Sequence, residues 1–241
     1  MSVDKSAIRI RDMFGQIASR YDLLNHLLSM GIDHRWRYRT VRLAPPRPGR
    51  PILDVCTGTA DLAMAYHRAC RRIPVQHRPL VIGADFCRPM LSRGIAKLRG
   101  RPAGGELLLI EADTLRLPFP DDTFQIVCVA FGLRNLCDTQ AGLREMVRVC
   151  ACDGKVVILE FSTPHRGLLA KMYRWYLERV LPRIGQALAR NQLGAYNYLP
   201  ASVAEFPQGH ALAAIMREAG LREVAMHRFT FGIVSLYIGT K

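Results

Sequence analysis

Short apolar runs alternate with helical segments through the middle of the chain, and this alternation constrains the fold more than any other feature. Each run is apolar on both faces, as expected of strands in a parallel sheet with helices on both sides. We expect the strands at Ile52–Cys56, Leu80–Ala84, Leu107–Ile110, Phe124–Ala130 and Lys155–Phe161, and the intervening helices up to Arg71, near Pro89–Leu98 and at Thr139–Val149. The pattern predicts an α/β fold with a doubly wound, mostly parallel sheet.

Two further strands are expected near the C-terminus. Ala211–Ala219 has a helical pattern and is followed by Gly220, a residue favoured just past a helix end. We expect Glu223–Phe229 and Ile233–Ile238 to pair antiparallel around Gly232. The predicted sheet then has seven strands.

Before the first strand, the chain has a helical pattern. Residues 10–28 carry apolar side chains at alternating steps of four and three, which predicts one amphipathic helix. Asp33 is expected to cap a second, arginine-rich helix that ends before Pro45. We expect residues 1–45 to form a helical lid on a single domain that spans 1–241.

Residues 163–206 interrupt the strand–helix rhythm after the fifth strand. The segment mixes aromatic residues, Tyr173, Trp175 and Tyr176 among them, with arginines. Because ligands bind at the carboxyl ends of the strands in open α/β sheets, an insertion here is expected to cover a substrate. The alternative is a packing helix pair without a function of its own.

The net charge and the cysteine pattern limit the kinds of binding partner and the cellular location that we expect for this protein. The formal net charge is +14, which favours nucleic acid or an anionic lipid surface as a partner, but 29 of the 34 basic residues are arginines, a bias that genome composition explains equally well. No apolar run reaches the ~18 residues of a membrane span, and the charged N-terminus is unlike a signal peptide. The seven cysteines show no metal-binding spacing. We therefore expect a cytoplasmic protein without a bound metal.

The turn after the first strand is the first candidate site. Asp54 lies in the strand, and Gly58 allows a tight turn and close approach of a ligand. Asp61 begins the following helix, where a carboxylate complements the helix dipole. The turn lacks the glycine pattern that binds a pyrophosphate, so a nucleoside with an amino-acid part suits it better.

Acidic residues follow the next two strands at the same edge of the predicted sheet. Asp85 is placed to accept the hydroxyl hydrogens of a ribose, and Asp113, followed by Thr114, to accept a hydrogen from the adenine amino group. Their coincidence at one edge favours binding of adenosine.

Several motifs resemble those of the methyltransferases of quinone biosynthesis, and the resemblance covers nearly the whole chain. The segments that carry it are Asp54–Leu62, Leu117–Phe124, Phe131–Asn135, Tyr21–Asn25, Leu28–Ile32, Leu159–Ser162, Leu181–Gly185 and Tyr196–Val203. Phe131–Asn135 is the most specific of them. Ala130 stands where some relatives have a serine that touches the cofactor, so no such contact is expected from it.

The resemblance implies a class I methyltransferase fold that binds S-adenosylmethionine through Thr59, Asp85 and the pair Asp113 and Thr114. The sequence Thr57–Asp61 is more similar to the menaquinone enzymes than to the ubiquinone enzymes. The implied reaction is C-methylation of a polyprenyl quinol ring, with demethylmenaquinol as the expected acceptor and a demethylated ubiquinol precursor as the alternative.

The catalytic residues that we expect lie mainly in the motif after the fourth strand. Arg134 would stabilise a developing oxyanion as a fixed cation, and Asn135 would orient a hydroxyl or a water. Asp22 and Tyr196 are candidates for the lid and the proton relay, although Asp22 could equally be a surface carboxylate.

Two other functions stay open at this point. An RNA methyltransferase would fit the charge, although no base-methylating N-P-P-Y-type motif is present. A protein that binds the cofactor without transferring the methyl group is the other. We expect no nucleic-acid partner, an anionic membrane surface as a peripheral partner at its inner face through the basic 163–193 segment, and leave a homodimer open.

Overall fold

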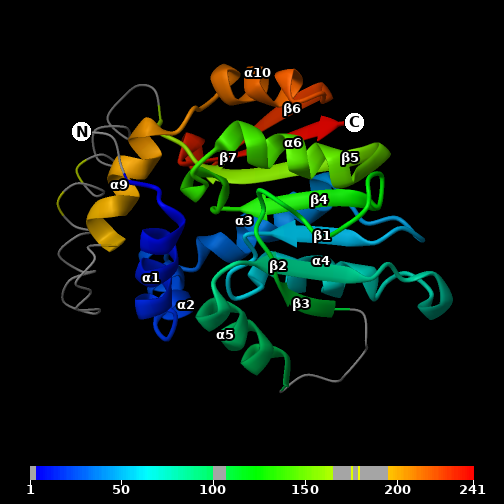
Figure 1. The fold of residues 1–241 in the computed structure, drawn as a ribbon, viewed down its shortest axis with the longest axis horizontal. Helices are drawn as coiled ribbons and strands as arrows, with labels where there is room; N and C mark the ends of the chain where they lie inside the picture. The colour runs from blue at the N-terminus through cyan, green and yellow to red at the C-terminus, as the bar shows by residue number, and fades with distance from the viewer. Residues whose placement is uncertain (1–3, 100–106, 165–174, 176–178, 180–194) are drawn as a thin grey trace.

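The computed structural model describes residues 4–99, 107–164, 175, 179 and 195–241. In this part of the chain seven strands form one sheet in the order β3-β2-β1-β4-β5-β7-β6 (Figure 1). The strands are β1 (Ile52–Val55), β2 (Val81–Asp85), β3 (Leu107–Glu111), β4 (Phe124–Ala130), β5 (Cys150–Phe161), β6 (Arg222–Phe229) and β7 (Val234–Thr240). Only β7 runs antiparallel to its neighbours, β5 and β6. The predicted doubly wound, mostly parallel, seven-stranded sheet is confirmed.

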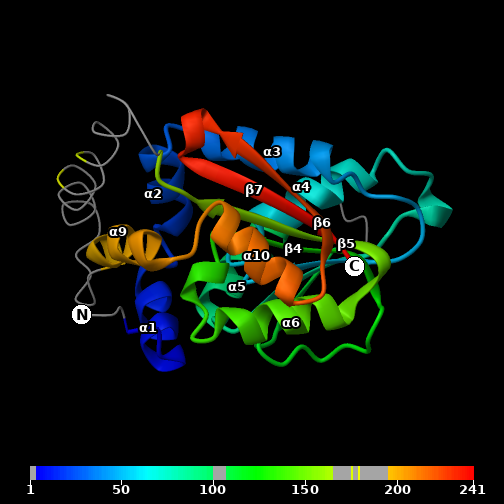
Figure 2. The same cartoon turned by 90° about the horizontal axis from the view of Figure 1, so that it is seen from above.

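Helices cover both faces of the sheet (Figure 2). On one face, α3 (Ile32–Leu43) and α4 (Asp61–Cys70) bury Trp36 and Tyr66 against the apolar residues of β1, β4 and β7. On the other, α6 (Thr139–Val149) and α10 (His210–Glu218) bury Met146 and Met216. Helix α5 (Arg88–Arg99) packs against β2 and β3. Strand β1 is buried at every position, which explains its continuously apolar sequence.

Three short helices stand at the carboxyl ends of the parallel strands (Figures 1 and 2). They are α1 (Ala7–Ile17), α2 (Tyr21–Leu28) and α9 (Ala195–Glu205). Helix α9 falls inside the predicted insertion, and most of the rest of that insertion lies outside the described residues. The strand ends and these three helices enclose the site described below.

The structure corrects three local predictions. The expected single helix over 10–28 is wrong, because α1 ends in a tighter turn in which Arg20 N–H donates to the Ile17 carbonyl (2.9 Å). Asp33 does not cap α3, which follows Gly31 at φ 73°; it lies in the first turn and accepts from side chains instead. Strand β5 begins at Cys150, not Lys155, because Cys150 already pairs with Phe124 of β4, and of residues 150–154 only Asp153 has a positive φ.

Candidate active site

The turn between β1 and α4 is held by Asp54. This carboxylate is 1% exposed and accepts hydrogen bonds from the Thr57 hydroxyl (2.6 Å) and the Ala63 N–H (3.0 Å). Burial raises the pKa of Asp54 to about 7, against the opposing effect of these hydrogen bonds. Asp54 thus fixes the shape of the turn from behind and does not itself line the cavity in front.

That cavity lies at the carboxyl ends of β1, β2 and β4, beneath α1 and α2. The residues that line it are Ile10, Phe14, Tyr21, Cys56, Gly58, Asp85, Phe86, Cys87, Met90, Ala130, Phe131, Gly132, Asn135 and Leu136. Of the predicted site residues, the structure therefore brings Gly58, Asp85 and Asn135 together around one space. The apolar residues that follow Asp85, and those of α1, were not predicted as site residues.

Asp85 is the main polar group of this cavity. Its two oxygens accept main-chain N–H groups, one from Gly58 (2.8 Å) and one from Cys87 (2.8 Å). Burial raises the pKa of Asp85, and these N–H donors oppose that rise. A carboxylate oxygen accepts more than one hydrogen, so Asp85 retains acceptor capacity for hydroxyl groups of a ligand. Gly58 is at φ 58°, a conformation that favours glycine.

The other predicted acid at this edge is placed differently. Asp113 is exposed, and its carboxylate accepts the main-chain N–H of Leu115 (2.9 Å). Thr114 is buried, and its hydroxyl lies 3.3 Å from the Cys56 Sγ, a side chain of the cavity wall. Both follow the end of β3 at the rim of the cavity, and neither lines it.

Four side chains join α2, part of the segment predicted to be a lid, to the turn after β1 and to α5. Thr59 donates to Asp22 (2.5 Å) and accepts from the Lys97 ammonium (3.0 Å), which also pairs with Asp22 (2.9 Å) and Asp61 (2.7 Å). Burial would raise the pKa of Asp61, but the charges of Arg37 and Lys97 outweigh it and lower the pKa. The predicted residues Asp22, Thr59 and Asp61 thus hold α2 against the turn after β1 and the start of α4, and none of them lines the cavity. Lys97 was missed because no local pattern marks it.

Arg134 is buried in the 3-10 helix η2 (Leu133–Asn135), directly after β4. Its Nη1 donates to the Glu160 carboxylate (2.7 Å), whose side chain is 1% exposed. Its Nε is buried without an acceptor among the described residues. Glu160 was not assigned a role from the sequence, although an acidic residue inside an apolar strand is a usable signal because a buried charge needs a partner.

Asn135 follows Arg134 and lines the cavity. Its Oδ1 accepts the hydroxyl of Tyr198, from α9, at 3.1 Å. Tyr196, the predicted tyrosine, belongs to the same helix, but its side chain lies outside the described residues.

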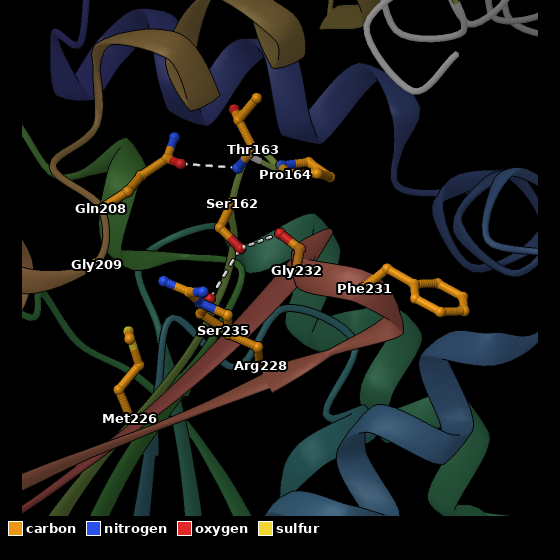
Figure 3. Close-up of a pocket in the computed structure, with 10 residues that line it drawn as sticks. All are labelled: Ser162, Thr163, Pro164, Gln208, Gly209, Met226, Arg228, Phe231, Gly232 and Ser235. Carbon is orange, nitrogen blue, oxygen red and sulfur yellow. Dashed lines mark hydrogen bonds between the residues drawn. The ribbon is translucent and has the colours of Figure 1, made fainter. Parts of the chain in front are cut away.

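A second cavity of about 270 Å³ lies at the end of β5 and the adjoining ends of β6 and β7 (Figure 3). Ser162 donates to or accepts from the Ser235 hydroxyl (2.9 Å) on one wall, and Gln208 accepts the Thr163 N–H (2.8 Å) on another. The rings of Phe161, which precedes Ser162, and Phe131, in the wall of the first cavity, are 4.5 Å apart. This ring pair connects the wall of the first cavity to the residue that precedes Ser162.

The residues of the first cavity fit the cofactor that the sequence implies. A buried carboxylate with spare acceptor capacity stands beside a left-handed glycine, and apolar side chains flank both. The cavity encloses about 50 Å³, whereas ligand pockets measure roughly 300–1,000 Å³. Since Ile10, Phe14 and Tyr21 form one wall, we expect α1 and α2 to move outward when the cofactor binds.

Comparison with known proteins assigns the family. The family model described as the ubiE/COQ5 methyltransferase family matches residues 1–241. A ubiquinone/menaquinone biosynthesis C-methyltransferase of Geobacter sulfurreducens is 45% identical over 97% of this chain and 88% of its own length. A demethylmenaquinone methyltransferase of Thermus thermophilus is 45% identical over 95% of this chain and 100% of its own length.

Solved structures agree on the fold alone. A SAM-dependent methyltransferase from Aquifex aeolicus has a TM-score of 0.60 at 15% identity, covering 85% of this chain and 88% of its own. A phosphoethanolamine N-methyltransferase of Haemonchus contortus has a TM-score of 0.55 at 13% identity, covering 83% of this chain and 50% of its own. With the sheet order and the whole-chain match, these findings show that the chain is a class I S-adenosylmethionine-dependent methyltransferase of the ubiE/COQ5 family.

Proposed function

We propose that the chain transfers a methyl group from S-adenosylmethionine to a ring carbon of demethylmenaquinol, with a demethylated ubiquinol precursor as the second candidate acceptor. The relative from Thermus thermophilus and a 42% identical one from Deinococcus radiodurans are both named demethylmenaquinone methyltransferases. The observation that carries the proposal is the buried cation Arg134 directly before Asn135, which lines the cofactor cavity.

A fixed cation at this place suits a quinol. As a ring hydroxyl loses its proton, the negative charge is shared between its oxygen and the neighbouring ring carbons. Arg134 lowers the energy of that charged form, because it is positioned beforehand by Glu160 and needs no reorganisation. Arg134 does not line the cavity itself, and its buried Nε has no acceptor among the described residues.

The remaining residues align the two reactants. When bound, the cofactor supplies an electrophilic methyl group, so the main task of the chain is to hold that group in line with the ring carbon. Asp85 would accept the hydrogens of the ribose hydroxyls, with the Gly58 main chain beside it. Asn135 would orient the ring hydroxyl from the cavity wall. The closed lid would exclude water from the site.

The acceptor is tested by direct competition. The purified chain would be given S-adenosylmethionine with demethylmenaquinol, a demethylated ubiquinol precursor or bulk RNA. We expect the highest kcat/KM for demethylmenaquinol. A higher value for the ubiquinol precursor would reassign the substrate, transfer only to RNA would contradict the proposal, and cofactor binding without any transfer would indicate a binding protein.

We further propose that the enzyme works at the inner face of an anionic membrane, where a polyprenyl quinol resides, and that it does not bind nucleic acid. None of the described helices is long and apolar enough to span a bilayer. Met30 and Phe231 are each 83% exposed, and both have positive φ, 51° and 56°. Backbone strain that holds a large apolar side chain in solvent calls for an apolar partner.

These two side chains lie at the same end of the molecule. Met30 precedes α3, and Trp36 of α3 donates its indole N–H to Thr230 (2.8 Å), the neighbour of Phe231. The exposed Arg35 and Arg228 lie near them in the sequence. Apolar tips with basic neighbours suit an anionic bilayer surface. Most of the basic segment 163–193 that led to the same expectation lies outside the described residues.

Vesicle binding tests this surface. We expect salt-sensitive binding to anionic vesicles, weak binding to neutral ones, and a loss of about tenfold or more when Met30 and Phe231 are both changed to serine. Val75 is 68% exposed and precedes β2, which lies in the half of the sheet away from β6 and β7, so Val75→Ser is the matched control. Equal binding of the double variant and the wild type would refute this surface. Equal binding to neutral and anionic vesicles would refute the role of charge.

A further inference from the structure

Tyr198 reaches from α9 to the motif after β4. Its hydroxyl lies 3.1 Å from the Oδ1 of Asn135, and the residue is 6% exposed. The two residues are 63 positions apart, so the contact is made only by the folded chain. No element of the sequence motif around Asn135 provides this partner.

The ring of Tyr198 also contacts α1, which belongs to the predicted lid. It packs with Ile10, Met13 and Ile17, the buried face of α1, in a small cluster of its own. Ile10 in turn lines the cofactor cavity. Tyr198 therefore joins three parts of the molecule: helix α9, the lid helix α1 and the cavity wall at Asn135.

The direction of the hydrogen bond decides which end of the Asn135 amide faces a substrate. Burial raises the pKa of Tyr198 to about 12, which the nearby Arg134 opposes, so the phenol stays protonated and can donate. An amide that rotates by half a turn exchanges its acceptor for its donor. The other contact of the amide, from Nδ2 to the Phe131 carbonyl, is long at 3.5 Å and holds the group weakly.

We propose that Tyr198 is a positioning residue, which fixes the Asn135 amide with its N–H groups available to the oxygen of the methyl acceptor. The ring contact with α1 links this orientation to the closed position of the lid. Tyr198 does not touch the reacting atoms, and it acts through Asn135. The inference rests on the proposed function, since it assumes an acceptor that presents an oxygen to Asn135.

Kinetics of Tyr198→Phe test the role of the hydroxyl, because this change keeps the ring and its packing. Tyr66→Phe is the matched control: the Tyr66 hydroxyl is fully buried and has no partner among the described residues. We expect Tyr198→Phe to lower kcat by about three- to tenfold, the effect of one neutral hydrogen bond. Cofactor affinity, by calorimetry, and Tm should match those of Tyr66→Phe.

A double-mutant cycle asks whether Tyr198 acts through Asn135. In the Asn135→Ala background, Tyr198→Phe should have no further effect on kcat, because the group that it positions is gone. If the two substitutions instead lower kcat independently, so that the double variant shows the product of the two single reductions, the proposal is overturned. It is also overturned by a kcat of Tyr198→Phe equal to that of Tyr66→Phe, or by a lower Tm with an unchanged kcat.

A spectroscopic readout separates this inference from the proposed function. The side-chain amide signals of Asn135 in a proton–nitrogen correlation spectrum are assigned by their absence in Asn135→Ala. They should shift or broaden in Tyr198→Phe and stay unchanged in Tyr66→Phe. Unchanged signals in both would overturn the proposal, even if no quinol is methylated. The wild-type rate on quinols tests the function, and the comparison of variants tests Tyr198.

Discussion

The cofactor side and the acceptor side of the site are held together in different ways. On the cofactor side, Asp85 is fixed by main-chain N–H groups, one of them only two residues away. On the acceptor side, Arg134 and Asn135 both donate to the Phe131 carbonyl, and each has in addition one side-chain partner from another element, Glu160 of β5 and Tyr198 of α9. Main-chain donors are set by the fold itself, whereas side-chain pairs exist only while both partners and their elements are in place.

The difference suggests that one side of the site determines cofactor binding and the other determines turnover. On the cofactor side, the sheet already places Asp85 at the end of β2, but the wall formed by α1 and α2 leaves a cavity of only about 50 Å³. The acceptor side is completed by α9, through the hydrogen bond of Tyr198 to Asn135 and the packing of Tyr198 on α1, whereas the Asp22 contacts join α2 to the turn after β1. We therefore expect substitutions on the two sides to separate into effects on cofactor affinity and effects on turnover.

The largest expected effect comes from Arg134→Ala. Turnover should fall by about 10²–10³, the usual cost of losing a donor to a developing oxyanion, while cofactor affinity changes little. The same substitution leaves Glu160 buried without its cation, which is expected to cost about 3–5 kcal/mol of stability. Rates and Tm must therefore be measured together.

A paired substitution separates catalysis from stability. In Arg134→Met with Glu160→Gln, no unpaired charge remains, so most of the stability should return while turnover stays low. If turnover returns with the stability, or if Arg134→Ala stays within threefold of the wild type, Arg134 is a structural partner of Glu160 and the acceptor side has been assigned wrongly.

On the cofactor side, Asp85→Ala should weaken binding of S-adenosylmethionine by about 1.5–3 kcal/mol, through loss of a charge-assisted hydrogen bond. Asp113→Ala is the comparison, because this carboxylate is exposed and bonded to the nearby Leu115 N–H. Its effect should be smaller. Calorimetry on the folded variants measures both affinities for S-adenosylmethionine. Equal losses of affinity at the two positions would show that burial does not distinguish the two acids.

Sequence reasoning succeeded where chemistry follows local structure. Parallel strands bring their carboxyl ends to one edge, so the places of Asp85 and Asp113 at the ends of β2 and β3 could be predicted from the apolar runs that precede them. The pattern could not predict that Asp85 lines the cavity and that Asp113 does not. Sequence reasoning failed where a residue depends on a distant partner. An acid inside an apolar strand indicates that Glu160 needs a partner but does not identify Arg134, and nothing in the sequence pairs Tyr198 with Asn135.

The break between α1 and α2 shows the same limit. The apolar steps continue from Ile17 to Tyr21, and neither glycine nor proline marks an end. The chain turns there because Tyr21 lines the cofactor cavity and Asp22 bonds Thr59 of the turn after β1. Tertiary contacts outweigh the helical periodicity, and a pattern within one segment cannot contain them.

The last expected effect is on stability alone, a pH dependence that originates behind the cofactor cavity. The pKa of Asp54 is raised to about 7 in the fold from an ordinary 3.8, so the folded state keeps a proton that the unfolded state loses. Its contribution to stability is complete below about pH 4 and is lost as the pH rises through 7.

Asp54→Asn should therefore flatten the fall in unfolding free energy over this range, by no more than about 1.4 kcal/mol per pH unit. Denaturant unfolding of the variant and the wild type from pH 4 to 8 measures it. Parallel curves for the two proteins would show that Asp54 is ionised throughout and that burial does not control its charge.

The central claim is that the acceptor side carries out C-methylation of a quinol ring. The most direct measurement uses S-adenosylmethionine labelled with carbon-13 in its methyl group, demethylmenaquinol as acceptor, and nuclear magnetic resonance of the extracted product. We predict the label on the ring carbon next to the polyprenyl chain. A label on a ring oxygen, or no labelled quinol while the cofactor is bound normally, would contradict the account.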